Sequence, residues 1–300
     1  MDNSNASASL ALGIDIGGSH ISAGVVDLVH KNIVSGSVVR QPVNRHAAAD
    51  EILGIWAGTI NDRLQQYPSA AKAIGFAMPG PFDYTNGICL IKGFDKYEAL
   101  YGMNIREALA ARTGCAVDRF LFRNDADAFL DGEVQGGSAQ GYSRVLALTL
   151  GTGLGSCVYL AGEITNAQLN VLPFKYGIAE EFLSTRWFVQ SWQQRTGTAI
   201  DGVKELAEMY GRNETANRIF DEFATNLGEF LRYCVCTYDV EAILIGGNIS
   251  NAYPLFIHQV QQQLPADRPL PVLKKAILGE QAAMIGAALH HQHNIVSTAY

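Results

Sequence analysis

The sequence predicts an α/β protein built on a duplicated fold, and three observations support this. Apolar runs of strand length alternate with segments of helical spacing along the whole chain. A pattern of strand, glycine turn and strand at 10–27 returns at 145–160, and internal repetition of this kind is typical of a duplicated fold. The length of 300 residues is sufficient for about two domains of roughly 150 residues each.

The first apolar segment predicts a β-hairpin whose turn is Gly17-Gly18-Ser19. A dinucleotide-binding turn and a P-loop would both open a helix at this point. Strand period continues instead after the turn, through Ile21, Ala23 and Val25. We therefore exclude both of those interpretations.

Helices and strands alternate along the rest of the chain. In the first half we expect a helix over 47–60, a strand over 73–78, an irregular loop over 82–101, a helix over 105–112, a strand over 119–123 and a helix over 126–135. In the second half we expect a hairpin over 145–160, helices over 180–194 and 221–236, a strand over 242–245 and a last helix over 281–290.

Composition and charge narrow the classes of function. The chain is 48% hydrophobic and only 17% charged, and its formal net charge is -7. It has no block of Lys or Arg, which is the pattern that nucleic acids and membrane surfaces attract. We therefore expect small-molecule partners, no nucleic acid and no membrane. With neither a positively charged start nor an apolar run of about 18 residues, the chain is expected to be cytoplasmic.

The five cysteines form no CxxC pair and are odd in number. This argues against both a disulfide framework and a structural zinc site. We interpret them as buried small apolar residues.

The glycine turns indicate a phosphorylated ligand. In Gly17-Gly18-Ser19 and Gly151-Thr152-Gly153, backbone N–H groups can converge on an anion because glycine has no Cβ to block its approach. One such turn alone would favour a simple tight hairpin. Two matched turns together with Gly246-Gly247 favour phosphate binding. Asp15, on the strand that enters the first turn, is a candidate ligand for Mg²⁺ or its water, or a strand-end turn former.

Asp125 follows a predicted strand and starts a predicted helix. Its position alone favours the interpretation that Asp125 is the N-cap of that helix. A carboxylate at a strand end opposite a phosphate cradle is also what phosphoryl transfer to an alcohol needs, because a base must accept the hydroxyl proton. The two roles are compatible.

Five motifs, in this order along nearly the whole chain, make it resemble the ROK group of sugar kinases, within the actin, hexokinase and Hsp70 ATPase superfamily. They are Gly13-Ile-Asp15-Ile-Gly17-Gly18-Ser19, Gly75-Phe-Ala-Met-Pro79-Gly80, Asn124-Asp125-Ala-Asp-Ala, Leu148-Thr149-Leu-Gly151-Thr152-Gly153-Leu-Gly155-Ser156 and Leu244-Ile-Gly246-Gly247-Asn248-Ile-Ser250.

The resemblance implies a two-domain, ribonuclease-H-like (actin-like ATPase) fold with an interdomain cleft that closes over ATP, Mg²⁺ and a sugar. It implies a small domain over 1–123, joined by a C-terminal helix at about 281–300, and a large domain over 124–280. The family relationship and the apolar composition together suggest a homodimer.

The resemblance also implies residue roles. Asp125 would be the general base, Asn124 would bind a neighbouring sugar hydroxyl and Asp15 would help to hold Mg²⁺. Gly17, Gly18, Ser19, Gly151, Thr152 and Gly153 would hold phosphates, Gly246 and Gly247 would pack against the nucleoside, and Glu180, the glutamate of the ExxxS motif, would contact the sugar ring.

The departures from the family pattern lie on the sugar side. The cysteine-rich zinc loop that most members carry is absent, as in the zinc-less branch that resembles polyphosphate glucokinases. Aligned with that branch, Gln168 stands where a sugar-binding glutamate is expected and Val171 where a histidine is expected. Lys92 is a candidate compensating donor, or a solvated lysine. His20 replaces the lysine that commonly follows the first glycine turn.

The leading hypothesis is an ATP- and Mg²⁺-dependent kinase that phosphorylates a hexose hydroxyl. Its rival is a non-catalytic pseudokinase or sensor of sugars or nucleotides on the same fold. Polyphosphate in place of ATP is a third alternative, against which the lack of a basic track counts.

Overall fold

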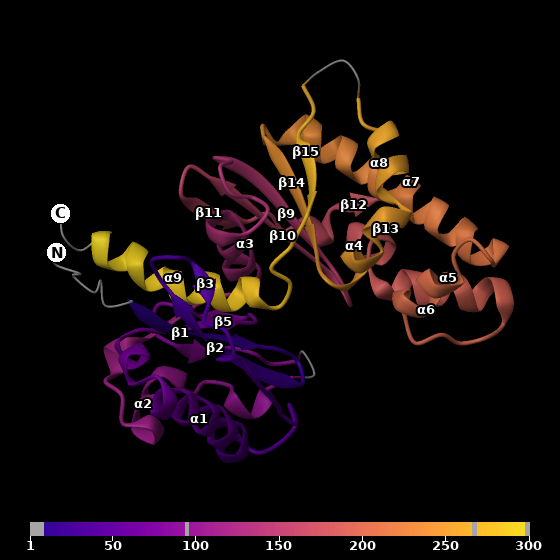
Figure 1. The fold of residues 1–300 in the computed structure, drawn as a ribbon. Coiled ribbons are helices and arrows are strands. Elements are labelled where there is room, and N and C mark those ends of the chain that lie inside the picture. The colour runs from indigo at the N-terminus through magenta and orange to yellow at the C-terminus, as the bar shows by residue number, and fades with distance from the viewer. Residues whose placement is uncertain (1–8, 94–95, 266–268, 298–300) are drawn as a thin grey trace. The chain divides into compact units, whose positions relative to one another are not determined.

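The computed structural model describes residues 9–93, 96–265 and 269–297, and the chain divides into two compact units (Figure 1). Unit 1 comprises Met1–Gly137 and Glu280–Tyr300, and unit 2 comprises Ser138–Gly279. Each unit has a sheet and a hydrophobic core of its own. The expected final helix is present as α9 (Gln281–Ser297), whereas 298–300 lie outside the described residues.

The sheet of unit 1 has the strand order β3-β2-β1-β5-β8, and β4 also pairs with β2. Strand β1 runs antiparallel to β2 and parallel to β5, which is parallel to β8. The strands are β1 (Leu10–Ile16), β2 (His20–Asp27), β3 (Asn32–Ile33), β4 (Val39–Pro42), β5 (Ile74–Met78) and β8 (Phe120–Asn124).

Helices cover both faces of this sheet. Helix α1 (Ala49–Gln66) buries Ile52, Trp56 and Ile60 in the same core as the apolar side chains of β1 and β2, because these positions recur with helical period. Helix α2 (Ile105–Thr113) joins that core; the Asn104 side chain caps its first turn. Helices α3 (Asp125–Gly136) and α9 pack together over the other face.

Unit 2 repeats the strand pairing of unit 1. Its sheet has the order β11-β10-β9-β14-β15, in which β9 runs antiparallel to β10 and parallel to β14. A hairpin whose first strand pairs in parallel with a later strand is thus present in both units, which confirms the duplicated α/β fold. The strands are β9 (Arg144–Leu150), β10 (Leu154–Leu160), β11 (Glu163–Asn166), β14 (Ala242–Gly246) and β15 (Val272–Lys275).

The core of unit 2 lies between its sheet and its helices. Helix α7 buries twelve side chains or glycines along one face. The helices are α4 (Ala179–Phe182), α5 (Thr185–Thr196), α6 (Val203–Met209), α7 (Glu214–Thr237) and α8 (Ile257–Gln262).

Short elements complete the two units. The loop expected over 82–101 contains a small hairpin and a 3₁₀ turn, and 94–95 are outside the described residues. The short strands are β6 (Phe82–Asp83), β7 (Ile88–Cys89), β12 (Pro173–Phe174) and β13 (Gly177–Ile178), and the 3₁₀ helices are η1 (Pro68–Lys72), η2 (Glu98–Leu100), η3 (Val117–Arg119), η4 (Leu169–Val171) and η5 (Asn248–Leu255).

Several details differ from the sequence expectations, and three of them bear on the site or on the cysteines. The helix expected over 180–194 is two helices, because the backbone of Ser184 is extended, with φ -127° and ψ 165°. The units divide between Gly137 and Ser138 rather than between 123 and 124, because α3 packs on α9 within unit 1. Cys236 is exposed and Cys115 only partly buried, whereas Cys89, Cys157 and Cys234 are buried as expected.

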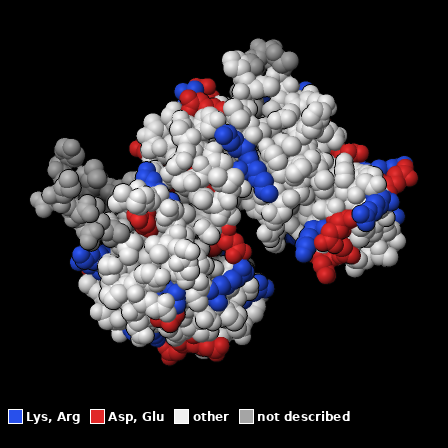
Figure 2. All heavy atoms as spheres, viewed as in Figure 1, with Lys and Arg blue, Asp and Glu red and all other residues white. Residues whose placement is uncertain are grey.

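On the face seen in Figure 2, acidic and basic side chains lie mostly in small groups, and one short basic stripe has no acidic side chain beside it. Within the described part of the chain, none of the helices has both the length and the apolar character that crossing a membrane requires.

Candidate active site

The first glycine turn joins β1 to β2 and is held by backbone and side-chain contacts. The Gly17 N–H donates to the His20 carbonyl at 2.9 Å, and the Ser19 carbonyl accepts from the Val43 N–H at 2.9 Å. The Tyr97 hydroxyl donates to the Gly17 carbonyl. Gly18 is exposed, and a Cβ built there would meet nothing within 4 Å. The tip of the turn is therefore open to a ligand.

Asp15 lies just before this turn, with Ser22 opposite it on β2 and Ala77 on β5. Its carboxylate makes no side-chain hydrogen bond to the described residues. Burial raises the pKa of Asp15 to about 7; the charges of Asp125 and Glu280 act in the same direction, and Arg40 opposes them. A partly buried carboxylate short of positive neighbours is a suitable position for a hard cation, so Asp15 fits the predicted Mg²⁺ role.

Asn124 and Asp125 lie at the junction of β8 and α3. The side-chain Oδ1 atoms of both residues accept from the Ala126 N–H, at 3.0 and 2.9 Å. Asn124 is therefore the N-cap, and Asp125 is the first residue of the helix. The prediction that Asp125 is the N-cap was wrong by one residue. Oδ2 of Asp125 accepts no hydrogen bond from the described residues, and this leaves it available to a substrate hydroxyl.

A contact that the sequence did not predict orients Asn124. Its Nδ2 donates to the Tyr84 hydroxyl at 3.1 Å, and that hydroxyl donates to the Met78 carbonyl at the end of β5, 3.0 Å away. Tyr84 follows the short strand β6, in the segment expected to be irregular. No periodicity marked this tyrosine, because its role depends on where the loop folds back.

Asp127 is a second residue that the sequence analysis did not single out. Its Oδ1 is buried without a hydrogen-bond partner. Burial raises the pKa of Asp127 to about 6; Arg123 opposes this, and Asp125 and Asp131 add to it. Arg123 itself is held by the buried Asp131 carboxylate at 2.6 Å. The start of α3 thus carries a row of carboxylates with one buried guanidinium beside it.

The second glycine turn, in unit 2, is tied to the segment that carries Glu180. The Thr185 N–H donates to the Gly151 carbonyl at 2.7 Å, and the Leu154 N–H donates to Oε2 of Glu180 at 3.0 Å. A Cβ on Gly153 would lie 2.5 Å from that same Oε2 atom, whereas one on Gly151 would meet nothing within 4 Å. Arg186 holds the other carboxylate oxygen of Glu180 at 2.6 Å. Glu180 therefore braces this turn, and Thr152 lies in it between the two glycines.

The third glycine turn follows β14. Gly247 has φ +79°, and a Cβ there would lie 2.3 Å from the carbonyl oxygen of Leu150, at the end of β9. Only glycine allows this close approach, which brings Gly246-Gly247 beside the second turn.

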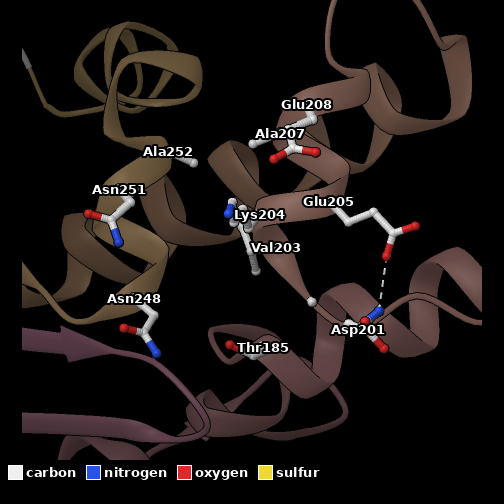
Figure 3. A pocket seen from close by; sticks show the side chains of 11 residues that line it. Thr185, Asp201, Val203, Lys204, Glu205, Ala207, Glu208, Asn248, Asn251 and Ala252 are labelled. Atoms are coloured by element: carbon white, nitrogen blue, oxygen red, sulfur yellow. Dashed lines mark hydrogen bonds between the residues drawn. The ribbon is translucent and has the colours of Figure 1, made fainter.

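A cavity of about 950 Å³ lies next to the second and third glycine turns and is lined only by residues of unit 2 (Figure 3). This is within the range of roughly 300–1,000 Å³ that small-molecule sites occupy. Figure 3 shows Asn248, Asn251 and Ala252 on one side, facing Val203 and Lys204 of α6. The lining residues are Thr185, Asp201, Gly202, Val203, Lys204, Glu205, Ala207, Glu208, Asn248, Asn251 and Ala252.

The sugar-side candidates lie in different places. Gln168 is exposed, and its backbone has a left-handed conformation with φ 50°. It precedes η4, and η4 packs against α4, the helix that carries Glu180. Val171 is 55% exposed. Lys92 belongs to unit 1, where its Nζ lies 5.0 Å from the centroid of the Tyr101 ring. The structure thus places Gln168 and Glu180 on neighbouring elements of unit 2.

Comparison with known proteins places the chain in a family. The model of the ROK family matches residues 11–169 and 175–293. The chain belongs to the ROK family. The N-acetyl-D-glucosamine kinase of Pectobacterium atrosepticum is 25% identical over 308 residues, which cover 93% of this chain and 98% of that protein. The glucokinase of Streptomyces coelicolor is 25% identical over 318 residues, which cover 93% and 96%.

A solved structure shares the ROK fold. The ROK glucokinase of Streptomyces griseus, in complex with glucose and AMPPNP, superimposes with a TM-score of 0.74 at 23% identity, covering 93% of this chain and 98% of that one. The likeness confirms the fold class that the motifs implied. In the part of this ROK chain that the structure describes, no three or more His, Cys, Asp or Glu side chains are grouped so as to hold a metal ion.

Proposed function

We propose that this protein is an ATP-dependent sugar kinase that transfers the γ-phosphate to a hydroxyl of a hexose or a related sugar. Its membership of the ROK family and relatives named N-acetyl-D-glucosamine kinase and glucokinase support this proposal. The observation that carries it furthest is the Asp125 carboxylate, oriented through Oδ1 and unbonded at Oδ2, in the same unit as the first glycine turn and Asp15.

The proposed reaction is a single displacement. The sugar hydroxyl oxygen bonds to the γ-phosphorus, the bond from that phosphorus to the β,γ-bridging oxygen breaks, and the hydroxyl proton passes to Oδ2 of Asp125. Asn124, oriented by Tyr84, would bind a neighbouring hydroxyl and keep the attacking oxygen in line. ADP, the phosphorylated sugar and protonated Asp125 are the products.

The chain offers groups for each part of the nucleotide. The backbone N–H groups of Gly17-Gly18-Ser19 and Gly151-Thr152-Gly153 would bind phosphates, and the cavity beside Gly246-Gly247 would take the nucleoside. Asp15 would hold Mg²⁺, directly or through water. A bound Mg²⁺ would neutralise charge on the transferring phosphoryl group.

On the sugar side we propose Glu180, Gln168 and Lys92 as binding residues. Glu180 has a further task in this proposal, because the same carboxylate holds the second glycine turn. Gln168 keeps one acceptor of the glutamate it replaces and adds a donor. Val171 offers no partner to a hydroxyl, and we therefore expect either a sugar that lacks or repositions that hydroxyl or weak binding of the sugar.

Several finer points remain predictions. They are a zinc-free enzyme, dependence on Mg²⁺, a homodimer, a cytoplasmic location, no nucleic-acid partner and preference for ATP over polyphosphate. They rest on the composition and on the motifs that are present or missing.

The test is a coupled phosphorylation assay with a panel of sugars that contains glucose, mannose, fructose, galactose, allose and the N-acetylhexosamines, with ATP or polyphosphate as donor. Asp125→Asn keeps an oxygen for the Ala126 N–H and removes the base, so turnover should fall by about a hundredfold or more. Asp118→Asn, at an exposed position of the same unit, is the control and should retain full activity.

Retained turnover in Asp125→Asn would exclude Asp125 as the base. Nucleotide binding without turnover on the whole panel would favour the non-catalytic sensor instead. Thermal melts of both variants would show whether either substitution unfolds the protein.

A further inference from the structure

Arg40, on β4, projects a guanidinium group toward the first glycine turn. Its NH1 group donates to both carboxylate oxygens of Glu280, each at 3.0 Å, and its NH2 group donates to Nδ1 of His20 at 3.3 Å. His20 follows the turn directly, and a Cβ on Gly17 would lie 2.5 Å from its ring. A chain of contacts therefore connects the turn to Arg40 through one imidazole ring.

The hydrogen bond defines the state of His20. Arginine can only donate, so Nδ1 of His20 must accept and carries no proton. Burial, and after it the charge of Arg40, lower the pKa of His20, while Glu280 opposes them. His20 is thus neutral at pH 7, and the positive charge at this place belongs to Arg40.

The geometry places the charge of Arg40 near the turn. Arg40 pairs in register with Ser22, and its guanidinium extends back along β2 to His20, the residue that follows the turn. An anion bound at the open tip of the turn would experience this positive charge.

Both partners in the ion pair are exposed to water. The side chain of Arg40 is 52% exposed and that of Glu280 is 67% exposed. An exposed pair of this kind contributes little to stability, because water competes for both charges. The three contacts use three of the five N–H donors of the guanidinium, so a second anion can still be bound.

We infer that Arg40 is a phosphate-binding residue of the first glycine turn, and that Glu280 is a resting partner which the phosphate displaces. The inference rests on the proposed function in one respect, namely that this turn binds the terminal phosphates of a nucleotide. A guanidinium pairs with two phosphate oxygens at once, which makes it suited to this exchange. His20 keeps the group turned toward the glycine turn during the exchange.

A purely structural role predicts a different outcome. In that case the pair only fastens β4 to the residue before α9, and the loss of either partner would have the same effect. A phosphate-binding role predicts opposite effects, because removal of Glu280 frees Arg40 whereas removal of Arg40 leaves no cation.

The test compares the affinities for AMPPNP with Mg²⁺, AMP and adenosine by titration calorimetry. Arg40→Gln should weaken AMPPNP binding by about tenfold or more and leave AMP and adenosine unchanged. Glu280→Gln should tighten AMPPNP binding. The control is Arg112→Gln, which breaks the Arg112–Asp50 pair on the surface of the same unit and should change none of the three affinities.

Equal AMPPNP affinity in Arg40→Gln and Arg112→Gln would overturn the inference, as would weaker binding in Glu280→Gln. Equal loss for all three ligands would do so too, since it would indicate a general disturbance of the fold. Arg40→Lys keeps the charge but not the paired geometry, and we expect an intermediate affinity.

The outcome can be separated from that of the proposed function. If the wild type binds AMPPNP but phosphorylates no sugar, the kinase proposal fails and the affinity comparison still decides the role of Arg40. If the wild type phosphorylates a sugar and Arg40→Gln binds AMPPNP normally, only the inference fails. If the wild type does not bind AMPPNP at all, the inference is overturned.

Discussion

At the scale of single residues, the site of unit 1 is governed by carboxylates whose burial outweighs the effect of the positive charges nearby. Burial raises the pKa of Asp15 to about 7 and that of Asp127 to about 6, and Asp125 adds to both effects. Ordinary surface carboxylates titrate near 4. The free protein therefore holds unfavourable charge that a bound cation would relieve, which is a common feature of functional sites.

Asp15→Asn is expected to stabilise the ligand-free protein, and increasingly so as pH rises. Because folding raises this pKa, the native state holds the proton more tightly than the unfolded chain. The stability that Asp15 contributes is fully present below about pH 4 and is lost as pH rises through about 7. Urea unfolding of both proteins at about pH 5 and about pH 8 should show a difference that grows with pH.

Asp83→Asn is the control for this prediction, because its carboxylate has the opposite behaviour. Hydrogen bonds from Asn86 lower the pKa of Asp83, so its contribution is present above the unfolded pKa and is lost only as pH falls through the lower folded pKa. Its effect should be constant between the two pH values. A constant or shrinking effect of Asp15→Asn would contradict the raised pKa.

The two glycines of the second turn are expected to respond differently to alanine. In Gly153→Ala the added Cβ displaces the Glu180 carboxylate and removes its bond to the Leu154 N–H, at a cost of about 1 kcal/mol. In Gly151→Ala the added Cβ meets no protein atom but projects where a phosphate would bind. Thermal melts and AMPPNP titrations should show lower stability for the first variant, and weaker binding with unchanged stability for the second.

Unchanged stability of Gly153→Ala would mean that Glu180 does not brace the turn. Unchanged AMPPNP affinity of Gly151→Ala would count against the phosphate cradle itself.

At the scale of elements, helices α3 and α9 cross at unusually short range. A Cβ on Gly286 of α9 would lie 1.9 Å from the Ala128 carbonyl oxygen, and one on Gly132 of α3 would lie 2.1 Å from that of Ala282. Both obstacles are backbone atoms, so no side-chain movement could remove the clash. The small residues of α9 are therefore required by this packing, and α3, with Asp125 at its start, is positioned by it.

Gly286→Ala is expected to destabilise the protein by about 1–3 kcal/mol or more, because the two helices must separate. Gly58→Ala is the matched control: Gly58 lies within α1, is exposed, and a Cβ there would meet nothing within 4 Å. Alanine should stabilise that helix by up to about 1 kcal/mol. Urea unfolding measures both, and effects of the same sign would contradict the close crossing.

At the scale of the whole molecule, the two units have separate cores and different parts of the proposed chemistry. Asp125, Asp15 and the first turn belong to unit 1, whereas the second turn, Glu180 and the cavity belong to unit 2. The first and the second glycine turn each join the two strands of a hairpin. The duplication therefore provides two similar glycine turns in different surroundings, and we propose that both bind phosphate.

Adenosine alone should protect unit 2 and leave unit 1 unaffected, because the cavity that we assign to the nucleoside is lined only by residues of unit 2. Hydrogen exchange with mass spectrometry should show slower exchange in α6 and η5 and no change in the β1–β2 hairpin. Asn251→Trp, at an exposed position of the cavity lining, should remove the protection. Protection limited to unit 1 would place the nucleoside elsewhere.

Local pattern was sufficient for most of the fold. The apolar runs of both hairpins were readable because their strands are buried at almost every position, and the helical spacing of α1 because one face of the helix is buried. The glycine turns and the Asn124-Asp125 junction were readable because they need particular residues at adjacent positions. The break between α4 and α5 could not be predicted, because Glu180 to Gln194 has helical spacing throughout. The break depends on a distant contact, in which the Thr185 N–H donates to the Gly151 carbonyl of the second turn.

Tyr84 and Arg40, which the sequence analysis missed, make long-range contacts with Asn124 and Glu280. The sequence analysis named Glu180 but not the long-range bond that its carboxylate accepts from the Leu154 N–H. Such contacts follow from the path of the chain between elements, and no period or motif in one segment contains that information. The spacing of residues therefore determined the secondary structure and the local turns. The orientation and the electrostatics of the site were decided only by the tertiary packing of segments that are distant in the sequence.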